Sequence, residues 1–160
     1  KMIFLLRKAE NPRILERYQQ QLISLSMRLN LQRCVEFIDR DLKNGEMHAI
    51  LSEVDVAIFP FKLIQADCPL SVMEAIEQGT LVIAPKIDGI PDLAIGKRAI
   101  IFTSGQAGLC RALEGAAAMI KEESPETMSQ NVRHNQFLPW SEVSSRFEAI
   151  LESIVKENEM

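Results

Sequence analysis

Short apolar runs alternate with longer amphipathic stretches along most of the chain. The runs are rich in Val, Ile, Leu and Phe and are bounded by polar or turn-forming residues, which is typical of strands buried on both faces of a parallel sheet. Between the runs, apolar residues recur every three to four positions, as on one face of a helix. The pattern predicts strands at 2–6, 34–38, 54–59, 81–84 and 99–102, a turn-rich loop at 88–92, and helices at 12–29, 45–53, 69–78, 107–121, 125–136 and 141–156.

The stretch DCPLSVMEAIEQGTLVIAP, at 67–85, is the clearest helix-to-strand transition. Pro69 occupies a first-turn position, where a missing N–H costs little, and Gly79 occupies a helix end that favours a positive φ. A buried strand follows directly. If 54–59 is the preceding strand, the unit is a β-α-β crossover. The loop at 60–68 then lies at the carboxyl edge of the sheet, where ligands of open α/β folds bind.

The alternation of strand and helix predicts an α/β fold, specifically a Rossmann-like, doubly wound parallel sheet of five to six strands with a helical C-terminal tail. At 160 residues, the chain is long enough for one domain with a substantial core. We therefore expect residues 1–160 to form a single domain. The first predicted strand begins directly after Lys1, with no cap or turn before it. This abrupt start predicts that the chain is part of a longer, two-domain protein.

Charge and cysteine content weigh against several classes of protein. The net charge is −4 and acidic and basic residues are interspersed, so no basic stripe is available to nucleic acid. The longest apolar runs are about five residues, far short of the roughly 20 that span a bilayer. Cys34, Cys68 and Cys110 are odd in number and far apart, which favours a reducing compartment over a disulfide framework or a zinc site.

Glu74 is the most evident candidate for a ligand-binding residue, and the pattern leaves two interpretations of it open. A carboxylate has two acceptor oxygens, so Glu74 at a ligand-binding edge can hold the two vicinal hydroxyls of a ribose. A glutamate on the polar face of a helix is most often simply solvated. Periodicity alone favours the solvated interpretation.

A series of short motifs adds to this pattern. An aspartate opens a strand that ends in proline, a Glu-Ala pair precedes a glycine, and a buried strand leads to a Gly-Ile-Pro-acid turn; these are Asp55, Pro60, Glu74-Ala75, Gly79, residues 81–84 and Gly89-Ile90-Pro91-Asp92. In this order and spacing, the segment 54–93 resembles the nucleotide-sugar-binding half of retaining glycosyltransferases with the GT-B fold, in the family called glycosyl transferases group 1. Weaker likeness covers nearly the whole chain, including Trp140-Ser141-Glu142 before the last predicted helix.

The resemblance implies a role for each of three segments. Glu74 corresponds to the residue that binds the ribose of the donor nucleotide. The turn that opens its helix corresponds to the part that faces the sugar and the diphosphate, and comprises Asp67, Cys68, Pro69, Leu70 and Ser71. The segment that corresponds to the surroundings of the base comprises Ile38, Asp39 and Arg40.

The chain also departs from the family pattern. Ala66 stands where the family usually has a glutamate, so Asp67 beside it is the candidate for the catalytic carboxylate. The family's glycine-rich turn after the first strand is replaced by Arg7-Lys8-Ala9-Glu10. Arg7 or Lys8 contacts phosphate or belongs to an ordinary charged loop. In such proteins the cations that clamp the diphosphate, and the whole acceptor domain, lie upstream of the position of Lys1.

Metal binding and general acid–base catalysis have weaker support in the sequence. Asp39-Arg40-Asp41 spells the Asp-x-Asp pattern by which a different glycosyltransferase fold holds a divalent metal, but two acids around one residue often arise by chance. His48 and His134 have no second histidine or cysteine at ligand spacing. Neither a nucleophile elbow nor Gly-x-Gly-x-x-Gly is present. We therefore expect no metal and no cofactor.

The prediction is the donor-binding half of a retaining, metal-independent glycosyltransferase. It moves a sugar from a nucleoside-diphosphate sugar, with uridine or guanosine expected as the nucleoside, to an unidentified acceptor. Its expected partner is an N-terminal acceptor-binding domain. The isolated half is expected to be inactive. It is expected in the cytoplasm, or peripheral to the inner face of the membrane through the missing domain, with no nucleic-acid partner. One alternative is a non-catalytic GT-B-like module that binds a nucleotide or a protein, and another is a nucleotide-sugar epimerase.

Overall fold

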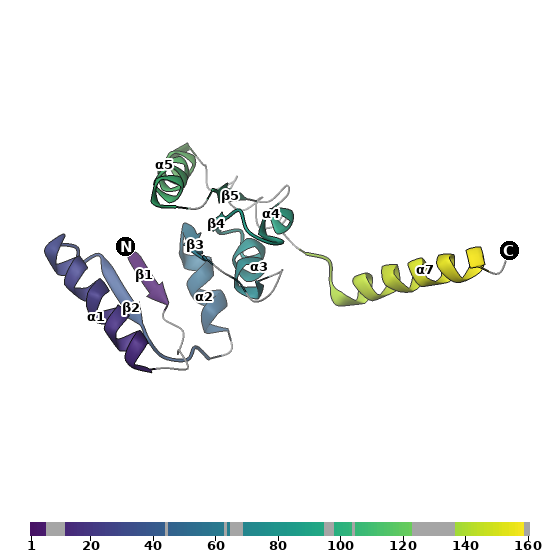
Figure 1. Cartoon of the computed structure of the whole chain (residues 1–160), viewed down its shortest axis with the longest axis horizontal. Coiled ribbons are helices and arrows are strands. Elements are labelled where there is room, and N and C mark those ends of the chain that lie inside the picture. Colours follow the sequence, from purple (N-terminus) through teal and green to yellow (C-terminus); the bar gives the residue numbers. More distant parts are fainter. Residues whose placement is uncertain are drawn as a thin grey trace. The chain divides into compact units, whose positions relative to one another are not determined.

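The computed structural model describes residues 1–5, 12–43, 45–62, 64, 69–94, 98–103, 105–122 and 137–158 of the 160-residue chain. Two compact units, Lys1–Met47 and His48–Met160, make up the chain. Figure 1 labels their helices and strands. Each unit has its own parallel sheet. The expectation of one domain over residues 1–160 stays a prediction.

The first unit is built from two parallel strands and the helix that joins them. Strand β1 (Met2–Leu5) leads to helix α1 (Pro12–Arg28), which returns the chain to strand β2 (Val35–Ile38). Phe4 lies opposite Phe37 in the ladder, and their rings stack with centroids 5.2 Å apart. The three elements predicted for this part of the sequence are therefore confirmed.

The second unit contains three parallel strands in the order β3-β4-β5. After helix α2 (Glu46–Glu53) come β3 (Val56–Ile58), α3 (Leu70–Glu77), β4 (Leu81–Pro85) and β5 (Ala99–Phe102). Parallel pairing of β3 with β4 confirms the predicted β-α-β crossover. With five parallel strands and the helices between them, the α/β class predicted from the sequence is confirmed; in the described residues, the ladders join the strands into one sheet of two and one of three.

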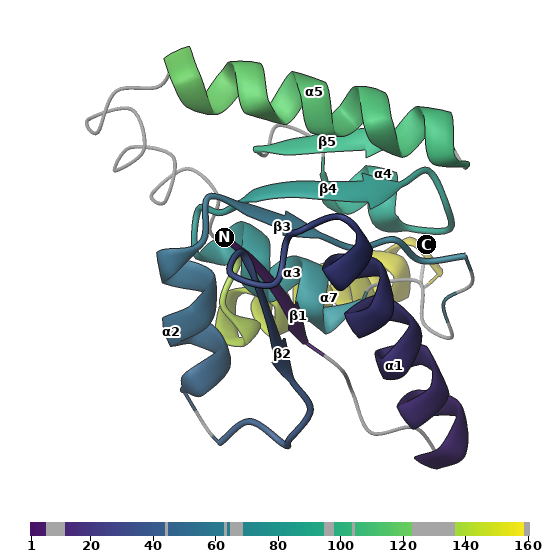
Figure 2. The same ribbon diagram turned by 90° about the vertical axis from the view of Figure 1, so that its left-hand side faces the viewer.

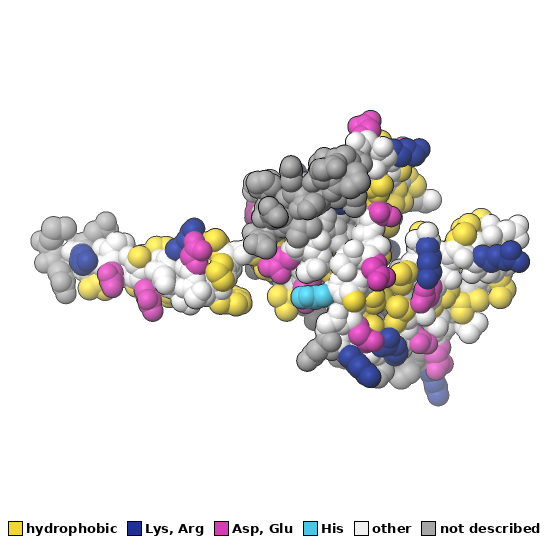
Figure 3. Space-filling view, turned by 180° about the vertical axis from the view of Figure 1, so that it is seen from behind, with side chains coloured by type: hydrophobic (Ala, Val, Ile, Leu, Met, Phe, Trp, Pro, Cys, Tyr) yellow, Lys and Arg dark blue, Asp and Glu magenta, His cyan; other side chains and the backbone are white. Residues whose placement is uncertain are grey.

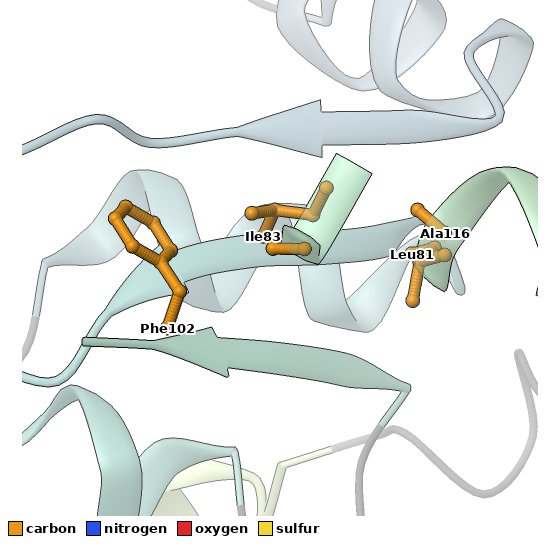
Figure 4. Packing of buried hydrophobic residues seen from close by; sticks show 5 residues of the cluster. Leu81, Ile83, Phe102 and Ala116 are labelled. Carbon is orange, nitrogen blue, oxygen red and sulfur yellow. The ribbon is translucent and has the colours of Figure 1, made fainter. Parts of the chain in front are cut away.

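Strand β4 is the core of the second unit, because all five of its residues are buried. On one face, Leu81 and Ile83 pack with Phe102 of β5 and with Ala112 and Ala116 of helix α5 (Gln106–Glu122) (Figure 4). Figure 2 shows α5 running along β5 and β4. Alternation along the strand directs the side chains of Val82 and Ala84 to the opposite face. Helix α3 contacts β4 as well, so the strand is covered by two helices.

Helix α5 approaches the end of β5 so closely that only a glycine fits at position 108, in the first turn of the helix. A Cβ atom on Gly108 would lie 2.1 Å from the carbonyl oxygen of Thr103. No side chain tolerates that separation, and the carbonyl is backbone that cannot rotate away. The strand end and the helix start are therefore held together at this point.

The loop predicted at 88–92 is wrong in part, since a short helix, α4 (Ile90–Leu93), occupies most of it. Gly89 is its N-cap and Pro91 lies in its first turn. Glycine and proline occur both in turns and at helix starts, where the fixed φ of proline suits the helix and its missing N–H has no intrahelical partner. The same residues that indicate a turn in the sequence therefore begin a helix in the structure.

Helix α7 (Trp140–Asn158) confirms the predicted last helix and its Trp-Ser-Glu start. Figure 3 shows apolar side chains along this helix. Its exposed large apolar residues are Trp140, Val143, Phe147, Ile150, Leu151, Ile154 and Val155. The helix predicted at 125–136 lies outside the described residues. Of the helices that the structure describes, none combines the length and the apolar character that crossing a membrane requires.

Candidate functional site

The carboxyl edge of the β3-β4-β5 sheet is where the sequence predicted a ligand. All three strands run in the same direction, so their last residues, Ile58, Pro85 and Phe102, lie at one edge. Backbone hydrogen bonds from Phe59 to Ile83 (2.9 Å) and from Lys86 to Phe102 (2.8 Å) extend the ladder there. A crossover helix runs back against its strands, so α3 begins at this same edge.

The first turn of α3 has no side-chain cap. Pro69 is the N-cap, with φ −66° and ψ 116°, so the prediction that it lies inside the first turn is wrong by one position. Its carbonyl oxygen accepts from the amides of Val72 (3.0 Å) and Met73 (3.3 Å). The amides of Leu70 and Ser71 precede these two, and among the described residues no side chain caps this helix end. Two backbone donors therefore face the edge where ligands of this fold class bind.

Glu74 lies one turn into the helix, on the same side as Leu70. Its side chain is half-buried. The opposite side of the helix carries Val72, Ala75 and Ile76, all buried, which confirms the predicted amphipathic division. The helix therefore presents a carboxylate close to its open N-terminal end, and the ribose contact of Glu74 stays a prediction.

The other end of α3 is closed by backbone hydrogen bonds. Gly79 has φ +74°, as the sequence predicted, and its amide donates to the Ile76 carbonyl (2.9 Å). The Thr80 amide donates to the Ala75 carbonyl (3.2 Å). These two bonds form a Schellman motif, which satisfies carbonyl groups that a helix end leaves without partners.

Two buried side chains reinforce this closed end. Arg98 is 8% exposed, and its Nη1 donates to the carbonyl of Gly79 (3.1 Å). A cation at a helix C-terminus also interacts favourably with the helix dipole. The hydroxyl of Thr80, which is 3% exposed, donates to the carbonyl of Leu51 at 2.7 Å. Helix α3 is thus fixed to the end of α2 and to the start of β5.

A second candidate segment follows β2 in the first unit. The Arg40 guanidinium forms a bidentate ion pair with Glu46, with Nη1–Oε2 at 2.8 Å and Nη2–Oε1 at 3.0 Å. The Lys43 amide donates to the same carboxylate at 2.6 Å. Asp39, directly after the strand, accepts a hydrogen bond from Gln19 of α1 (3.3 Å).

These contacts change the acid–base behaviour of the ion pair. The hydrogen bond from Arg40, followed by the one from the Lys43 amide, lowers the pKa of Glu46 to about 2. The hydrogen bond to Glu46 in turn raises the pKa of Arg40. Because the pKa of Glu46 is lower when folded, the pair's contribution to stability, which is small for exposed groups, is present above the unfolded pKa and is lost as the pH falls towards 2.

The structure describes only some of the predicted site residues. It brings Pro69, Leu70, Ser71 and Glu74 together at one end of α3, in the second unit. Ile38, Asp39 and Arg40 lie together at the end of β2, in the first unit. The remaining predicted residues lie outside the described ones, and they are Arg7, Lys8, Asp67 and Cys68, together with Ala66.

Three residues that shape these segments were not predicted from the sequence. Glu46 is the acidic residue in the first turn of α2, and an acid at a helix start is a recognisable signal. Arg98 follows Lys97 and resembles a surface cation, so nothing in the sequence indicates its burial. Thr80 follows Gly79, at a position where a Schellman motif places its second bond.

The described residues contain no group of three or more histidine, cysteine, aspartate or glutamate side chains that could hold a metal ion. His48 is exposed on α2, and His134 lies outside the described residues. The Asp39 and Asp41 pattern therefore has no third protein ligand within the described part of the chain.

Comparison with solved structures identifies similar folds. The catalytic domain of starch synthase IV from Arabidopsis thaliana, bound to ADP and acarbose, aligns with a TM-score of 0.67 and 16% identity over 97% of this chain and 38% of that one. Sucrose-phosphate synthase from Thermosynechococcus elongatus aligns with a TM-score of 0.66 and 18% identity, over 96% and 38%. HepE from Anabaena, in complex with UDP, aligns with a TM-score of 0.61 and 16% identity, over 96% and 40%. The chain thus spans about two-fifths of the length of these proteins.

Sequence comparison gives the family. No curated protein matches the sequence. A family model described as glycosyl transferases group 1 matches residues 10–130, which is most of the chain and includes β2, α3 and β4. The chain therefore belongs to the glycosyl transferases group 1 family.

Proposed function

We propose that this chain is the nucleotide-sugar donor-binding half of a retaining, metal-independent glycosyltransferase. Family membership supports sugar transfer as the general activity. Two of the similar structures contain bound ADP and bound UDP, which supports a nucleotide as the ligand. The observation that carries the proposal is the N-terminal end of α3, where backbone donors without a side-chain cap lie at the carboxyl edge of a parallel sheet, with Glu74 one turn away.

The chemistry of this helix end suits a nucleoside diphosphate. The positive end of the helix dipole favours an anion by about 0.3–1 kcal/mol, and by more in a partly buried position. The amides of Leu70 and Ser71 donate to diphosphate oxygens. Glu74 accepts from the two ribose hydroxyls, which are neighbouring donors that match its two oxygens.

Catalysis requires more than this half. The chain spans about two-fifths of the similar structures, so the proposal includes an N-terminal domain that supplies the acceptor site and further cations. The protein stabilises the departing diphosphate by electrostatics, and the acceptor attacks from the same side of the sugar within the closed cleft. We place this reaction in the cytoplasm because the few cysteines suit a reducing compartment.

A nucleotide titration followed by amide NMR tests the proposal. The chain should bind at least one of UDP, GDP and ADP with a dissociation constant of about 0.1–1 mM, since few contacts must offset the cost of immobilising the ligand. Shifts should cluster at Ile38–Arg40 and Asp67–Glu74. A chelator should leave binding unchanged. The absence of amide shifts with all three nucleotides at millimolar concentration would favour the non-catalytic module. Binding that is lost when a chelator is added would indicate Asp39 and Asp41 as metal ligands.

Glu74→Gln tests the ribose contact. The variant should lose about 1.5–3 kcal/mol of nucleotide affinity, because a charge-assisted hydrogen bond is lost and its neighbour is misplaced. Glu77→Gln is the matched control, since Glu77 is also half-buried on α3 but lies at the closed end. Equal losses in both variants would contradict a specific ribose contact, and a large fall in melting temperature would make Glu74 structural.

Asp67→Asn tests the carboxylate that the proposal assigns to catalysis. In the full-length protein, the substitution should lower kcat strongly and leave nucleotide affinity nearly unchanged, as expected for a group that acts in the transition state. Turnover equal to that of the parent protein would exclude Asp67 from the mechanism.

A further inference from the structure

The carboxylate of Glu46 closes the loop that follows β2. It accepts three hydrogen bonds: two from the terminal nitrogens of Arg40, at 2.8 and 3.0 Å, and one from the amide of Lys43, at 2.6 Å. The Glu46 amide in turn donates to the carbonyl of Lys43 at 3.0 Å. The guanidinium of Arg40 and the amide of Lys43 are thus both bound to one side chain at the start of α2.

The guanidinium of Arg40 already donates hydrogen bonds to groups within this loop. Its Nη1 donates to the Asp41 carbonyl (3.2 Å) as well as to Oε2 of Glu46, and its Nη2 donates to Oε1 of Glu46. A phosphate would have to displace a carboxylate that matches the planar fork of the guanidinium. The negative charge of Glu46 also offsets the attraction that Arg40 would otherwise exert on an anion. This geometry suits a support better than a ligand contact.

We propose that Arg40 and Glu46 form a strut that holds the loop after β2 in the shape that receives the nucleoside part of the donor, with Arg40 as a positioning residue. This inference rests on the proposed function, and it replaces the direct donor contact that the family resemblance implies for Arg40. The loop backbone and Asp39, directly after β2, are then the parts that the strut orients.

The strut should act on binding rather than on global stability. The side chains of Arg40 and Glu46 are 57% and 34% exposed, and exposed ion pairs contribute little to folding. A loop that is already ordered loses less freedom when the ligand binds. Breaking the pair should therefore weaken nucleotide binding and leave the melting temperature nearly unchanged.

A double-mutant cycle on nucleotide binding tests the strut. Arg40→Gln and Glu46→Gln should each raise the dissociation constant about three- to tenfold, and the double variant should be no worse than either single one, because all three remove the same strut. The free nucleoside and the nucleoside diphosphate should lose the same factor, since phosphate contacts are untouched. Arg146→Gln is the control, because it breaks an exposed pair with Glu142 (2.6 Å) on α7.

Opposite results identify a direct contact. If Arg40→Gln weakens binding and Glu46→Gln does not, Arg40 touches the ligand and the strut is wrong. A larger loss for the diphosphate than for the nucleoside would likewise assign Arg40 to phosphate. Unchanged affinity in both single variants would also overturn the inference.

A measurement without nucleotide separates this inference from the proposed function. Failure of the unsubstituted protein to bind any nucleotide would refute the proposed function by itself. Hydrogen exchange at the Lys43 amide still reports on the strut, because Glu46 accepts its hydrogen bond. Exchange should accelerate in Arg40→Gln as in Glu46→Ala. No acceleration in Arg40→Gln would show that Arg40 does not hold the carboxylate in place.

Discussion

The two ends of helix α3 differ in how their backbone groups are satisfied. At the C-terminal end, Gly79 and Thr80 complete a Schellman motif, and buried Arg98 donates to a carbonyl there. At the N-terminal end, Pro69 caps the helix without a side-chain hydrogen bond, and Leu70 is 71% exposed. The closed end lies at the amino edge of the sheet and the open end at its carboxyl edge.

This difference separates residues that stabilise the fold from residues that bind a ligand at the two ends of one short helix. A buried helix end without partners would cost stability, so the closed end must satisfy its carbonyl groups within the protein. The open end faces a surface, where a ligand can supply the missing acceptors. Substitutions at the closed end should therefore change stability, and substitutions at the open end should change nucleotide binding.

Ile76→Ala should have the largest effect. Ile76 is fully buried near the closed end, and truncating such a side chain typically costs about 2–5 kcal/mol because a cavity remains. Leu70→Ala at the open end should change stability by no more than about 0.5 kcal/mol. Urea denaturation of both variants measures the contrast, and comparable losses would contradict it.

Arg98→Met should rank second. The substitution keeps much of the side-chain volume but removes the charged donor to Gly79, which should cost about 1.5–3 kcal/mol of unfolding free energy. Arg98→Lys retains the charge and should recover part of the loss. If both variants unfold at the parent's urea midpoint, the buried cation does not stabilise the helix end.

Gly79→Ala should cost about 1–2 kcal/mol, because an alanine is strained at φ +74°. Gly115→Ala on α5 is the matched control. A Cβ there meets only Ile100 Cδ1, at 3.7 Å, so alanine should stabilise the helix by about 0.5–1 kcal/mol. Thermal unfolding should shift in opposite directions, and a shift in the same direction would refute the role of the positive φ.

Thr80→Val should cost about 0.5–1.5 kcal/mol through loss of the buried hydroxyl bond to Leu51. Ser52→Ala removes a similar hydroxyl bond, to the Ala49 carbonyl at 2.9 Å, at an exposed position. The exposed control should lose less than Thr80→Val in the same denaturation assay. A reversed order would show that burial does not decide the value of these bonds.

Pro69→Asp should have the smallest effect on stability and should make the open end resemble the closed one. An aspartate cap gains about 0.5–1 kcal/mol, and loss of proline costs about 0.4–1 kcal/mol, so the two nearly cancel. The new carboxylate competes with the diphosphate for the amides and should weaken nucleotide binding. Calorimetric titration measures that loss, and unchanged affinity would mean that the helix end does not contact the phosphates.

Most elements of the fold could be predicted from the sequence, because each combines a hydrophobic period with an end signal. Strand β5 has the predicted bounds, and β4 extends one residue further, to Pro85. Errors arise where one residue type serves two purposes. Pro69 suits both an N-cap and a first turn, and Gly89 suits both a loop and a helix start.

The candidate site could be predicted only where it lies within one element. Leu70, Ser71 and Glu74 share a helix, so their spacing places them together. The pairing of Arg40 with Glu46 depends on the path of the loop between them, which no periodicity records. The burial of Arg98 depends on how β5 begins beside the end of α3, and this contact between distant segments is likewise absent from the local pattern.

The central place of β4 has a consequence for the order in which the chain folds. Its ladders join Leu81 to Val56 and Val82 to Ala99, so neither pairing is local in the sequence. Closing such loops costs entropy before the contacts repay it, and folding is slow when contacts are distant. Helix α3 shortens one of these loops when it forms. We therefore expect the β3-α3-β4 unit to be the nucleus, and substitutions that destabilise it to slow refolding rather than speed unfolding.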